Sequence, residues 1–136
     1  MNNTRFAIAI HILTLLDHSG KERLSSKYLA GSINANAAMV RKELSNLNAH
    51  GLVESKAGKY GGSSLAKPAD AIKLSDVYRA VRQTPALGSK RDHPNPHCPV
   101  GKEINDHLSD LYQETEDILM SRLGERTLAE FSRQFA

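Results

Sequence analysis

Apolar residues near the start of the chain fall into two helical stripes. The stripes lie about a third of a turn apart, with Phe6, Ile10 and Leu13 in one and Ile8, Ile12 and Leu15 in the other. They predict a helix over residues 4–18 with Thr4 as its N-cap. A helix with two apolar sides must be covered on both, so one side is expected to pack on its own domain. The other side requires another element or a second subunit.

The next part of the pattern predicts two more helices joined by a turn. Ser25 or Ser26 is expected to cap a short helix that runs to about residue 31. Residues 32–36 form a polar turn, and a longer helix is expected over residues 37–50. Its inner face is a stripe with spacings of 3, 4 and 3, formed by Ala37, Val40, Leu44 and Leu47. This order of elements is typical of a helix-turn-helix motif.

A hairpin is predicted directly after the third helix. Residues 52–56 alternate as a strand does, and residues 63–67 have the composition of a return strand. Between them, Gly58, Gly61 and Gly62 surround a short polar tip, and glycine accepts the positive φ angles of tight loops. This position after a helix-turn-helix motif indicates the wing of a winged helix.

The region after the hairpin combines a short helix with a proline-rich segment. Ser75 is expected to cap a helix that contains Val77, Tyr78 and Val81. Residues 84–99 hold four of the five prolines and show little periodicity, which predicts a mobile loop.

A long helix is predicted over residues 100–123, with Gly124 at its end and a short helix capped by Thr127 after it. Its apolar positions recur at spacings of 4, 3, 4 and 3, which is the pattern of a coiled-coil-like seam. The candidate dimer-interface residues are Ile104, Leu108, Leu111, Thr115 and Ile118.

Composition and charge narrow the class of protein. The 136 residues are 40% hydrophobic and 24% charged, which is normal for a soluble globular chain. No apolar run approaches the roughly 18 residues of a membrane span, and a single cysteine favours a reducing, cytoplasmic location. Residues 1–82 hold 12 Lys or Arg against 6 Asp or Glu, whereas residues 83–136 hold 6 against 9. The basic front half favours a polyanionic partner, although chance scatter of surface charge gives the same counts.

These elements predict a mainly α fold, a winged helix-turn-helix with a two-stranded β wing and a long C-terminal dimerisation helix. Residues 1–83 are expected to form the DNA-binding domain and residues 84–99 a proline-rich loop. Residues 100–136 are expected to form the dimerisation helix and a short terminal helix.

The outer face of the third predicted helix carries side chains suited to DNA. A helix-turn-helix motif places this helix in the major groove. There, Arg41 can bind guanine and Asn36 can bind adenine through paired hydrogen bonds. Lys42 and Ser45 suit phosphate oxygens, and Ala38 permits close approach to the bases. The alternative is an amphipathic helix that is merely solvated.

The hairpin adds Lys56, Lys59 and Tyr60 to this candidate surface. A cation among glycines can lie along the minor groove, which attracts Arg and Lys. The alternative is an exposed hairpin whose lysines protect its edge from pairing. Helix and hairpin together favour double-stranded DNA as the partner.

A specific order of motifs lies between residues 51 and 81. Gly51-Leu52-Val53 ends the third helix, Gly61-Gly62 forms the hairpin tip, and Ile72-Lys73-Leu74-Ser75-Asp76-Val77 starts the next helix. Together with the first and the long helix, this order resembles the Rrf2 family of winged-helix regulators. The resemblance implies a homodimer held by the first helix and the long C-terminal helix. It also implies DNA contacts at Asn36, Ala38, Arg41, Lys42, Lys59 and Tyr60.

The chain departs from the cluster-binding members of that family at its cysteines. Those members carry three cysteines in and after the loop that precedes the long helix, whereas this chain has only Cys98. A thiolate cluster normally takes four ligands. His93, His97 and His107 could in principle bind zinc or a Rieske-like centre together with Cys98, but a solvated loop is the simpler interpretation. We therefore expect no metal and no cofactor.

Cys98 is also a candidate redox sensor. A helix N-terminus and a protonated His97 both lower the pKa of a thiol, and an exposed thiolate is readily oxidised. We favour the alternative, a small buried residue that packs the loop onto the long helix.

The predicted function is that of a sequence-specific DNA-binding transcriptional regulator. It is expected to act as a homodimeric repressor on a palindromic operator, with a redox or small-molecule signal as a candidate input. An enzyme is not expected, because the sequence contains no phosphate loop, metal-ligand helix motif or serine-centred elbow. The alternative is a protein-interaction module that docks on a partner enzyme through the acidic long helix or the proline-rich loop.

Overall fold

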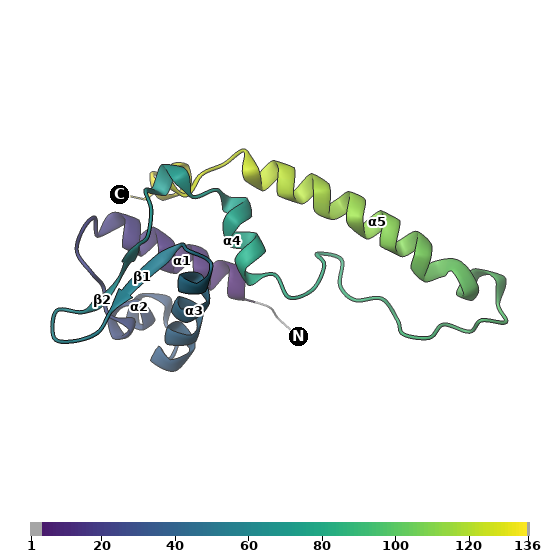
Figure 1. Cartoon of the computed structure of the whole chain (residues 1–136), viewed down its shortest axis with the longest axis horizontal. Helices are drawn as coiled ribbons and strands as arrows, with labels where there is room; N and C mark the ends of the chain where they lie inside the picture. Colours follow the sequence, from purple (N-terminus) through teal and green to yellow (C-terminus); the bar gives the residue numbers. More distant parts are fainter. Residues whose placement is uncertain (1–3, 136) are drawn as a thin grey trace.

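The computed structural model describes residues 4–135, in which a winged helical domain carries one long projecting helix (Figure 1). Its elements, in chain order, are α1 (Arg5–His18), α2 (Ser26–Ile33), α3 (Ala37–Ala49), β1 (Val53–Lys56), β2 (Gly62–Leu65), the short 3₁₀ helix η1 (Ala69–Ala71), α4 (Leu74–Val81), α5 (Pro99–Gly124) and α6 (Leu128–Ser132). The predicted winged helix-turn-helix with a two-stranded wing and a long helix near the C-terminus is confirmed.

Helix α1 is the element around which the domain packs, because it contacts α2, α3, α4, α6 and β2. It buries Ile12, Leu13 and Leu16 completely. The predicted cap at Thr4 is wrong, since its side chain makes no cap hydrogen bond. A capping side chain needs an extended backbone, whereas Thr4 has φ −101° and ψ 7°.

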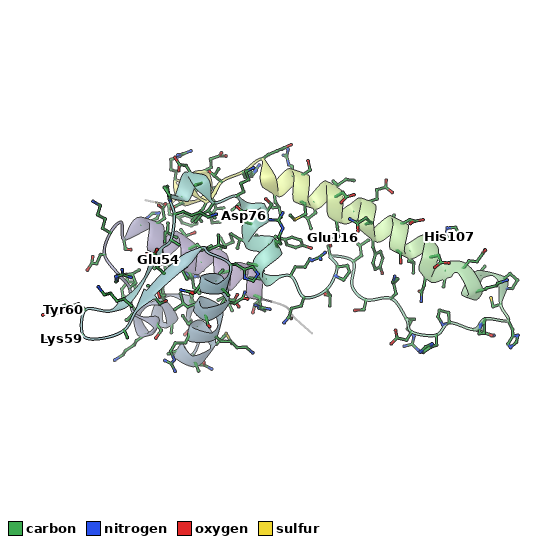
Figure 2. The ribbon with its side chains drawn as sticks, in the orientation of Figure 1. Glu54, Lys59, Tyr60, Asp76, His107 and Glu116 are labelled. Atoms are coloured by element: carbon green, nitrogen blue, oxygen red, sulfur yellow. The ribbon has the colours of Figure 1, made fainter. Side chains whose placement is uncertain are left out.

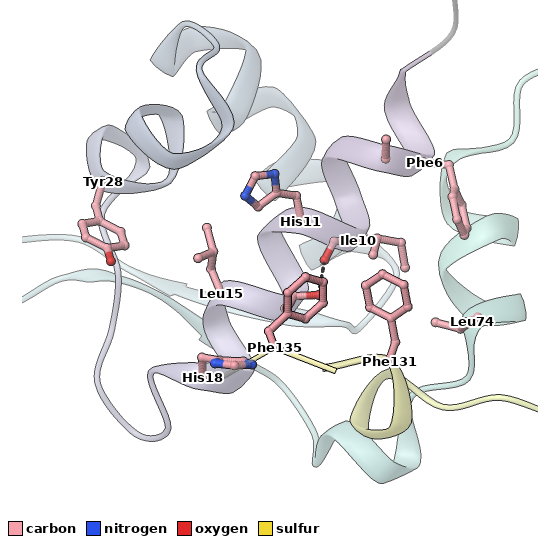
Figure 3. A pocket seen from close by; sticks show the side chains of 11 residues that line it. Phe6, Ile10, His11, Leu15, His18, Tyr28, Leu74, Phe131 and Phe135 are labelled. Atoms are coloured by element: carbon pink, nitrogen blue, oxygen red, sulfur yellow. Dashed lines mark hydrogen bonds between the residues drawn. The ribbon is translucent and has the colours of Figure 1, made fainter. Parts of the chain in front are cut away.

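The side of α1 that carries Phe6 and Ile10 is covered in part by α6. Phe131 and Phe135 approach α1 there, with Leu74 of α4 beside them (Figure 3). A groove of about 760 Å³ remains between these helices, lined also by Phe6 and Ile10. Another element of the same chain thus supplies part of the cover that the sequence pattern required.

Helices α2 and α3 form the predicted helix-turn-helix motif. The Ser25 side chain accepts the N–H of Tyr28 and caps α2, and the Asn36 side chain accepts the N–H of Met39 and caps α3. Between the helices, Asn34 adopts the left-handed conformation with φ 62°, which asparagine tolerates better than most residues. Of the predicted inner face of α3, Val40, Leu44 and Leu47 are buried and Ala37 is half-buried.

The wing is an antiparallel hairpin in which Val53 pairs with Leu65 and Lys56 pairs with Gly62. Both strands are shorter than the sequence suggested, and Gly62 belongs to β2 rather than to the loop. Gly62 has φ +131°, and a Cβ there would lie 2.8 Å from the carbonyl oxygen of Leu24. The wing therefore packs so closely against the segment before α2 that only glycine fits.

Helix α4 begins one residue before the predicted cap. Ser75 lies inside the helix and is buried, so its assignment as N-cap is wrong. The N-cap position is Lys73, whose backbone N–H donates to the Asp76 carboxylate at 2.9 Å. An acidic side chain in the first turn can accept this N–H and stabilise the start of a helix without a serine cap.

The proline-rich segment runs alongside α5 rather than away from it (Figure 1). Asn105 of α5 donates to the carbonyl oxygen of Arg91 at 2.9 Å, and the Lys90 ammonium donates to the Ser109 hydroxyl. These contacts hold a segment that the sequence pattern predicts to be mobile. Its last residue, Pro99, is the first residue of α5.

After α5 the chain returns to the winged domain. Thr127 caps α6 as predicted, and backbone hydrogen bonds join Leu128 to Ile72 and Leu74 to Arg126. Helix α6 packs on α1 and η1. The division into residues 1–83, 84–99 and 100–136 stays a prediction, and this packing groups α6 with the first of the three parts.

Candidate nucleic-acid interface

The two faces of α3 differ sharply in exposure. Val40 and Leu47 are fully buried, whereas Arg41, Lys42 and Ser45 are exposed on the other side, as is Ala38. The apolar stripe with spacings of 3, 4 and 3 produces this division, because it turns one side of the helix into the core. Two cations and a hydroxyl therefore face outward together.

Asn36 is exposed at the start of α3, but its side chain already serves the helix. Its Oδ1 accepts the N–H of Met39 at 2.8 Å. A paired contact to adenine needs an acceptor and a donor, so Oδ1 would have to share its second lone pair with the base. The cap hydrogen bond also holds the Asn36 side-chain amide close to the backbone N–H groups at the start of α3, a position that favours anions such as phosphate.

Two of the three predicted hairpin residues lie at the tip, whereas Lys56 is the last residue of β1. Figure 2 shows Lys59 and Tyr60 where the wing projects beyond the helices, and Tyr60 is 86% exposed. The Lys59 Nζ lies 5.7 Å from the centre of the Tyr60 ring, a cation–π distance. Gly61 makes the tight turn possible, since a Cβ there would lie 2.1 Å from the carbonyl oxygen of Lys56.

Lys27 is an exposed cation of the same motif that the sequence interpretation missed. It lies in the first turn of α2, two residues after the Ser25 cap. The first helix of a helix-turn-helix motif crosses the DNA backbone. A lysine two residues after a predicted serine cap was the available signal.

A buried carboxylate, also missed by the sequence interpretation, joins α4, α5 and the proline-rich segment. Glu116 of α5 faces α4 (Figure 2), where it accepts hydrogen bonds from the Tyr78 hydroxyl, from Arg82 Nη1 at 3.0 Å and from the N–H of Ala86 at 2.7 Å. Burial alone raises the pKa of Glu116, but these donors and the Arg82 charge outweigh it and hold that pKa below its usual value. Burial, followed by the hydrogen bond to Glu116, raises the pKa of Tyr78.

Cys98 occupies the N-cap position of α5 and is half-buried. Hydrogen bonds from the backbone N–H of Gly101 and then of Val100 lower the pKa of its thiol. The helix start thus supplies the effect predicted for it. His97 lies beside Cys98 in the sequence and is exposed.

The candidate seam of α5 is partly uncovered in a single chain. Leu111 is 50% exposed and Ile118 is 66% exposed, while Ile104, Leu108 and Thr115 are half-buried. A contact between α4 and α5 covers a different side of the helix, where Glu116 lies.

No helix among residues 4–135 is long and apolar enough to cross a lipid bilayer. A family model described as Rrf2, an iron-dependent transcriptional regulator, matches residues 2–134. The match covers the helix-turn-helix motif, the wing, the long helix and all of α6.

The donor set of this chain does not fit the iron in that description. Cys98 is the single cysteine of the sequence. Across residues 4–135, no group of three or more His, Cys, Asp and Glu side chains is arranged to hold a metal ion. Iron–sulfur clusters usually need four cysteine or histidine ligands, so one copy of this chain does not provide such a centre.

Individual relatives agree with the family match. The Bacillus subtilis (strain 168) protein YwnA, provisionally named an HTH-type transcriptional regulator, is 39% identical over 128 residues, which are 94% of each chain. A solved structure provisionally described as a DNA-binding protein is 34% identical, with a TM-score of 0.75 over 93% of this chain and 97% of that one. CymR, the global cysteine regulator of B. subtilis, shares the fold, with a TM-score of 0.73 at 23% identity over 100% of this chain and 98% of its own. The chain therefore belongs to the Rrf2 family and is a transcriptional regulator.

Proposed function

We propose that two copies of this chain bind a palindromic DNA operator and repress transcription from it. Each copy places α3 in a major groove and its wing on the neighbouring backbone. The observation that carries this proposal is the division of α3, with Val40 and Leu47 in the core and Arg41 and Lys42 exposed. A partner of double-stranded DNA agrees with a cytoplasmic location. We propose no catalytic role for the chain.

The side chains divide the work between recognition and positioning. Arg41 binds a guanine edge through its fork of N–H donors, and Ala38 lets the backbone approach the bases. Lys42, Ser45 and the Asn36 end of α3 bind phosphate. The wing adds Lys56, Lys59 and Tyr60, which contact the backbone or the minor groove.

The exposed seam of α5 supports dimerisation. Leu111 and Ile118 leave apolar surface open on the side of α5 away from Glu116. A second α5 laid along this seam would bury that surface with knobs-into-holes packing. Two-fold symmetry would then place two copies of α3 on half-sites about one helical turn, roughly 10 base pairs, apart or a multiple of it.

Selection of bound duplexes from a random pool tests this function. We expect a palindromic consensus, and an affinity that falls steeply as salt rises because bound phosphates release counterions. The same selection with reduced and oxidised protein tests any effect of the thiol. Failure to enrich any sequence, or binding to random duplex that does not depend on salt, would contradict the proposal.

A redox input at Cys98 is a second proposal, favoured by one observation. Cys98 is the N-cap residue of α5 and lies where the proline-rich segment joins the helix, so a change in the chemical state of its thiol would act on both. Oxidation to sulfenic acid, or to a disulfide between two copies, would change the dimer and weaken DNA binding.

Docking of a partner enzyme is the alternative to DNA binding. Acidic side chains of α5 such as Asp106, Asp110 and Glu114 are exposed and suit a basic partner surface. Absent or salt-independent binding to DNA would favour this alternative.

A further inference from the structure

Glu43 is a charged residue on the buried side of α3. Only 6% of it is exposed, and it lies on the face that also buries Val40, Leu44 and Leu47. Burial of a charge is strongly unfavourable unless it is paired and hydrogen-bonded. The partners of this carboxylate therefore indicate why the helix keeps it.

Three helices meet at the Glu43 carboxylate. From α1, Arg5 Nε donates to Oε2 at 3.0 Å and Arg5 Nη2 donates to Oε1 at 3.3 Å. Within α3, Asn46 Nδ2 donates to Oε1 at 3.2 Å, and it also donates to the carbonyl oxygen of Ala80 in α4 at 2.9 Å. These polar contacts join α3 to α1 and α4 at one point.

This cluster constrains α3 in a way that its apolar contacts do not. Hydrophobic contacts have no preferred direction, so they oppose separation of the helices more than a small rotation or slide. A guanidinium that donates two parallel hydrogen bonds to a carboxylate fixes both distance and angle. Arg41 and Lys42 directly precede Glu43, so any rotation of α3 displaces them.

We propose that Glu43 is a positioning residue that sets the orientation of Arg41 and Lys42 toward DNA through its contacts with Arg5 and Asn46. The inference rests on the proposed DNA-binding function. The contact between Arg5 of α1 and Glu43 of α3 would thus hold the recognition helix at a fixed angle to the rest of the domain.

The proposal predicts that replacing Glu43 weakens operator binding more than the accompanying loss of fold stability can explain. Removing one partner of a buried ion pair lowers the stability of a fold because it leaves the other charge uncompensated. That loss is limited here because the Arg5 side chain is 30% exposed and stays in contact with water when Glu43 is replaced. A base contact, in contrast, tolerates displacements of only about 0.5 Å.

The test compares Glu43→Leu, Glu43→Gln and Arg5→Lys with the wild type in full-length protein. Thermal unfolding is measured beside binding to the selected operator and to random duplex. Glu54→Gln is the matched control, because it removes an exposed carboxylate from β1 of the same domain. We expect the operator Kd of Glu43→Leu to rise on the order of tenfold. Its Tm falls but stays above the temperature of the binding assay, and its random-duplex Kd stays near that of the wild type. Glu54→Gln binds the operator no more weakly than the wild type.

Two further variants separate charge from geometry. Arg5→Lys keeps the positive charge but loses the fork of donors, so it should weaken operator binding as Glu43→Leu does. Glu43→Gln keeps the shape of the side chain but weakens its contacts with Arg5 and Asn46. Its operator Kd should therefore lie between those of the wild type and Glu43→Leu.

The outcomes that overturn the proposal are distinct. Operator binding within about twofold of the wild type in both Glu43 variants would remove the positioning role. A parallel loss of operator affinity, random-duplex affinity and Tm would assign Glu43 to structure alone. A wild type that selects no operator would contradict the proposed function itself, which separates that failure from a failure at Glu43.

Discussion

The hydroxyl oxygen of Tyr78 lies 3.0 Å from Oε1 and 3.1 Å from Oε2 of Glu116, and so ties α4 to α5. Arg82 and the N–H of Ala86 complete the environment of the same carboxylate. The Tyr78 ring also meets Phe6 of α1 edge-on, with 6.3 Å between ring centres. Through Glu116 and Tyr78, α5 is thus connected to α4 and α1 of the winged domain.

Replacement of Glu116 by Gln should destabilise the fold in a pH-dependent manner. The change weakens several charge-assisted hydrogen bonds, and we expect a loss of about 1–3 kcal/mol at pH 7. The pKa of Glu116 lies below its usual value of 4.5 in the folded chain. The unfolded chain therefore binds the proton more tightly, and the stabilisation present above pH 4.5 is lost as the pH falls through the lower, folded-state pKa.

Urea unfolding at neutral and acidic pH measures this effect. The gap between the wild type and Glu116→Gln should narrow as the solution is acidified. Glu114→Gln is the control, since it neutralises an exposed carboxylate of the same helix. A gap that is independent of pH would show that the charge of Glu116 is not what stabilises this contact.

Arg41→Ala should reduce both affinity and specificity for the operator. Loss of a paired contact to guanine is expected to cost about 1–3 kcal/mol and to relax the preference at one base pair of each half-site. Competition binding against operators substituted at single positions measures both effects. Lys59→Ala serves as the comparison, and it should weaken binding to all sequences evenly and reduce the dependence on salt. A change of base preference in Lys59→Ala would contradict this division of roles.

Ile118→Asp should convert the dimer into a monomer. A charge placed in an apolar seam loses water without gaining a partner. Ile118 is more than half exposed in one chain, so the monomer itself should stay folded. Sedimentation equilibrium beside far-ultraviolet circular dichroism measures assembly and fold. Gln113→Glu adds a charge on an exposed position of the same helix and should leave the dimer intact. A wild type that sediments as a monomer would refute the interface.

Oxidation should release the protein from its operator through Cys98. Peroxide converts a thiolate into sulfenic acid, and diamide joins two thiols into a disulfide. Fluorescence anisotropy of operator DNA, with and without oxidant and again after a thiol reductant, measures release and recovery. Cys98→Ser removes the single thiol of the chain and should bind DNA whether or not oxidant is present. Equal release of the Ser variant would exclude Cys98 as the sensor.

Much of the fold was predictable because it depends on residues close together in the sequence. The stripe that contains Val40 and Leu47 predicted which side of α3 is buried, and therefore which side carries Arg41. Ser25, one of the two candidate caps of α2, and Thr127 predicted helix starts, because each side chain accepts an N–H only three residues ahead. The same reasoning failed at Ser75, where an aspartate one residue later accepts the N–H of Lys73 instead.

The sequence by itself determined the helices, the wing and the outward position of the candidate DNA-binding side chains. Periodicity and capping act over a few residues and leave a visible pattern. Only the tertiary structure decided that Arg5 pairs with Glu43, 38 positions away, and Arg82 with Glu116, 34 positions away. A charged residue in an apolar stripe is visible in a sequence, but its partner depends on how helices pack in space. The physical reason is that a buried carboxylate needs a partner wherever it lies. Which residue becomes that partner depends on which helices pack against each other.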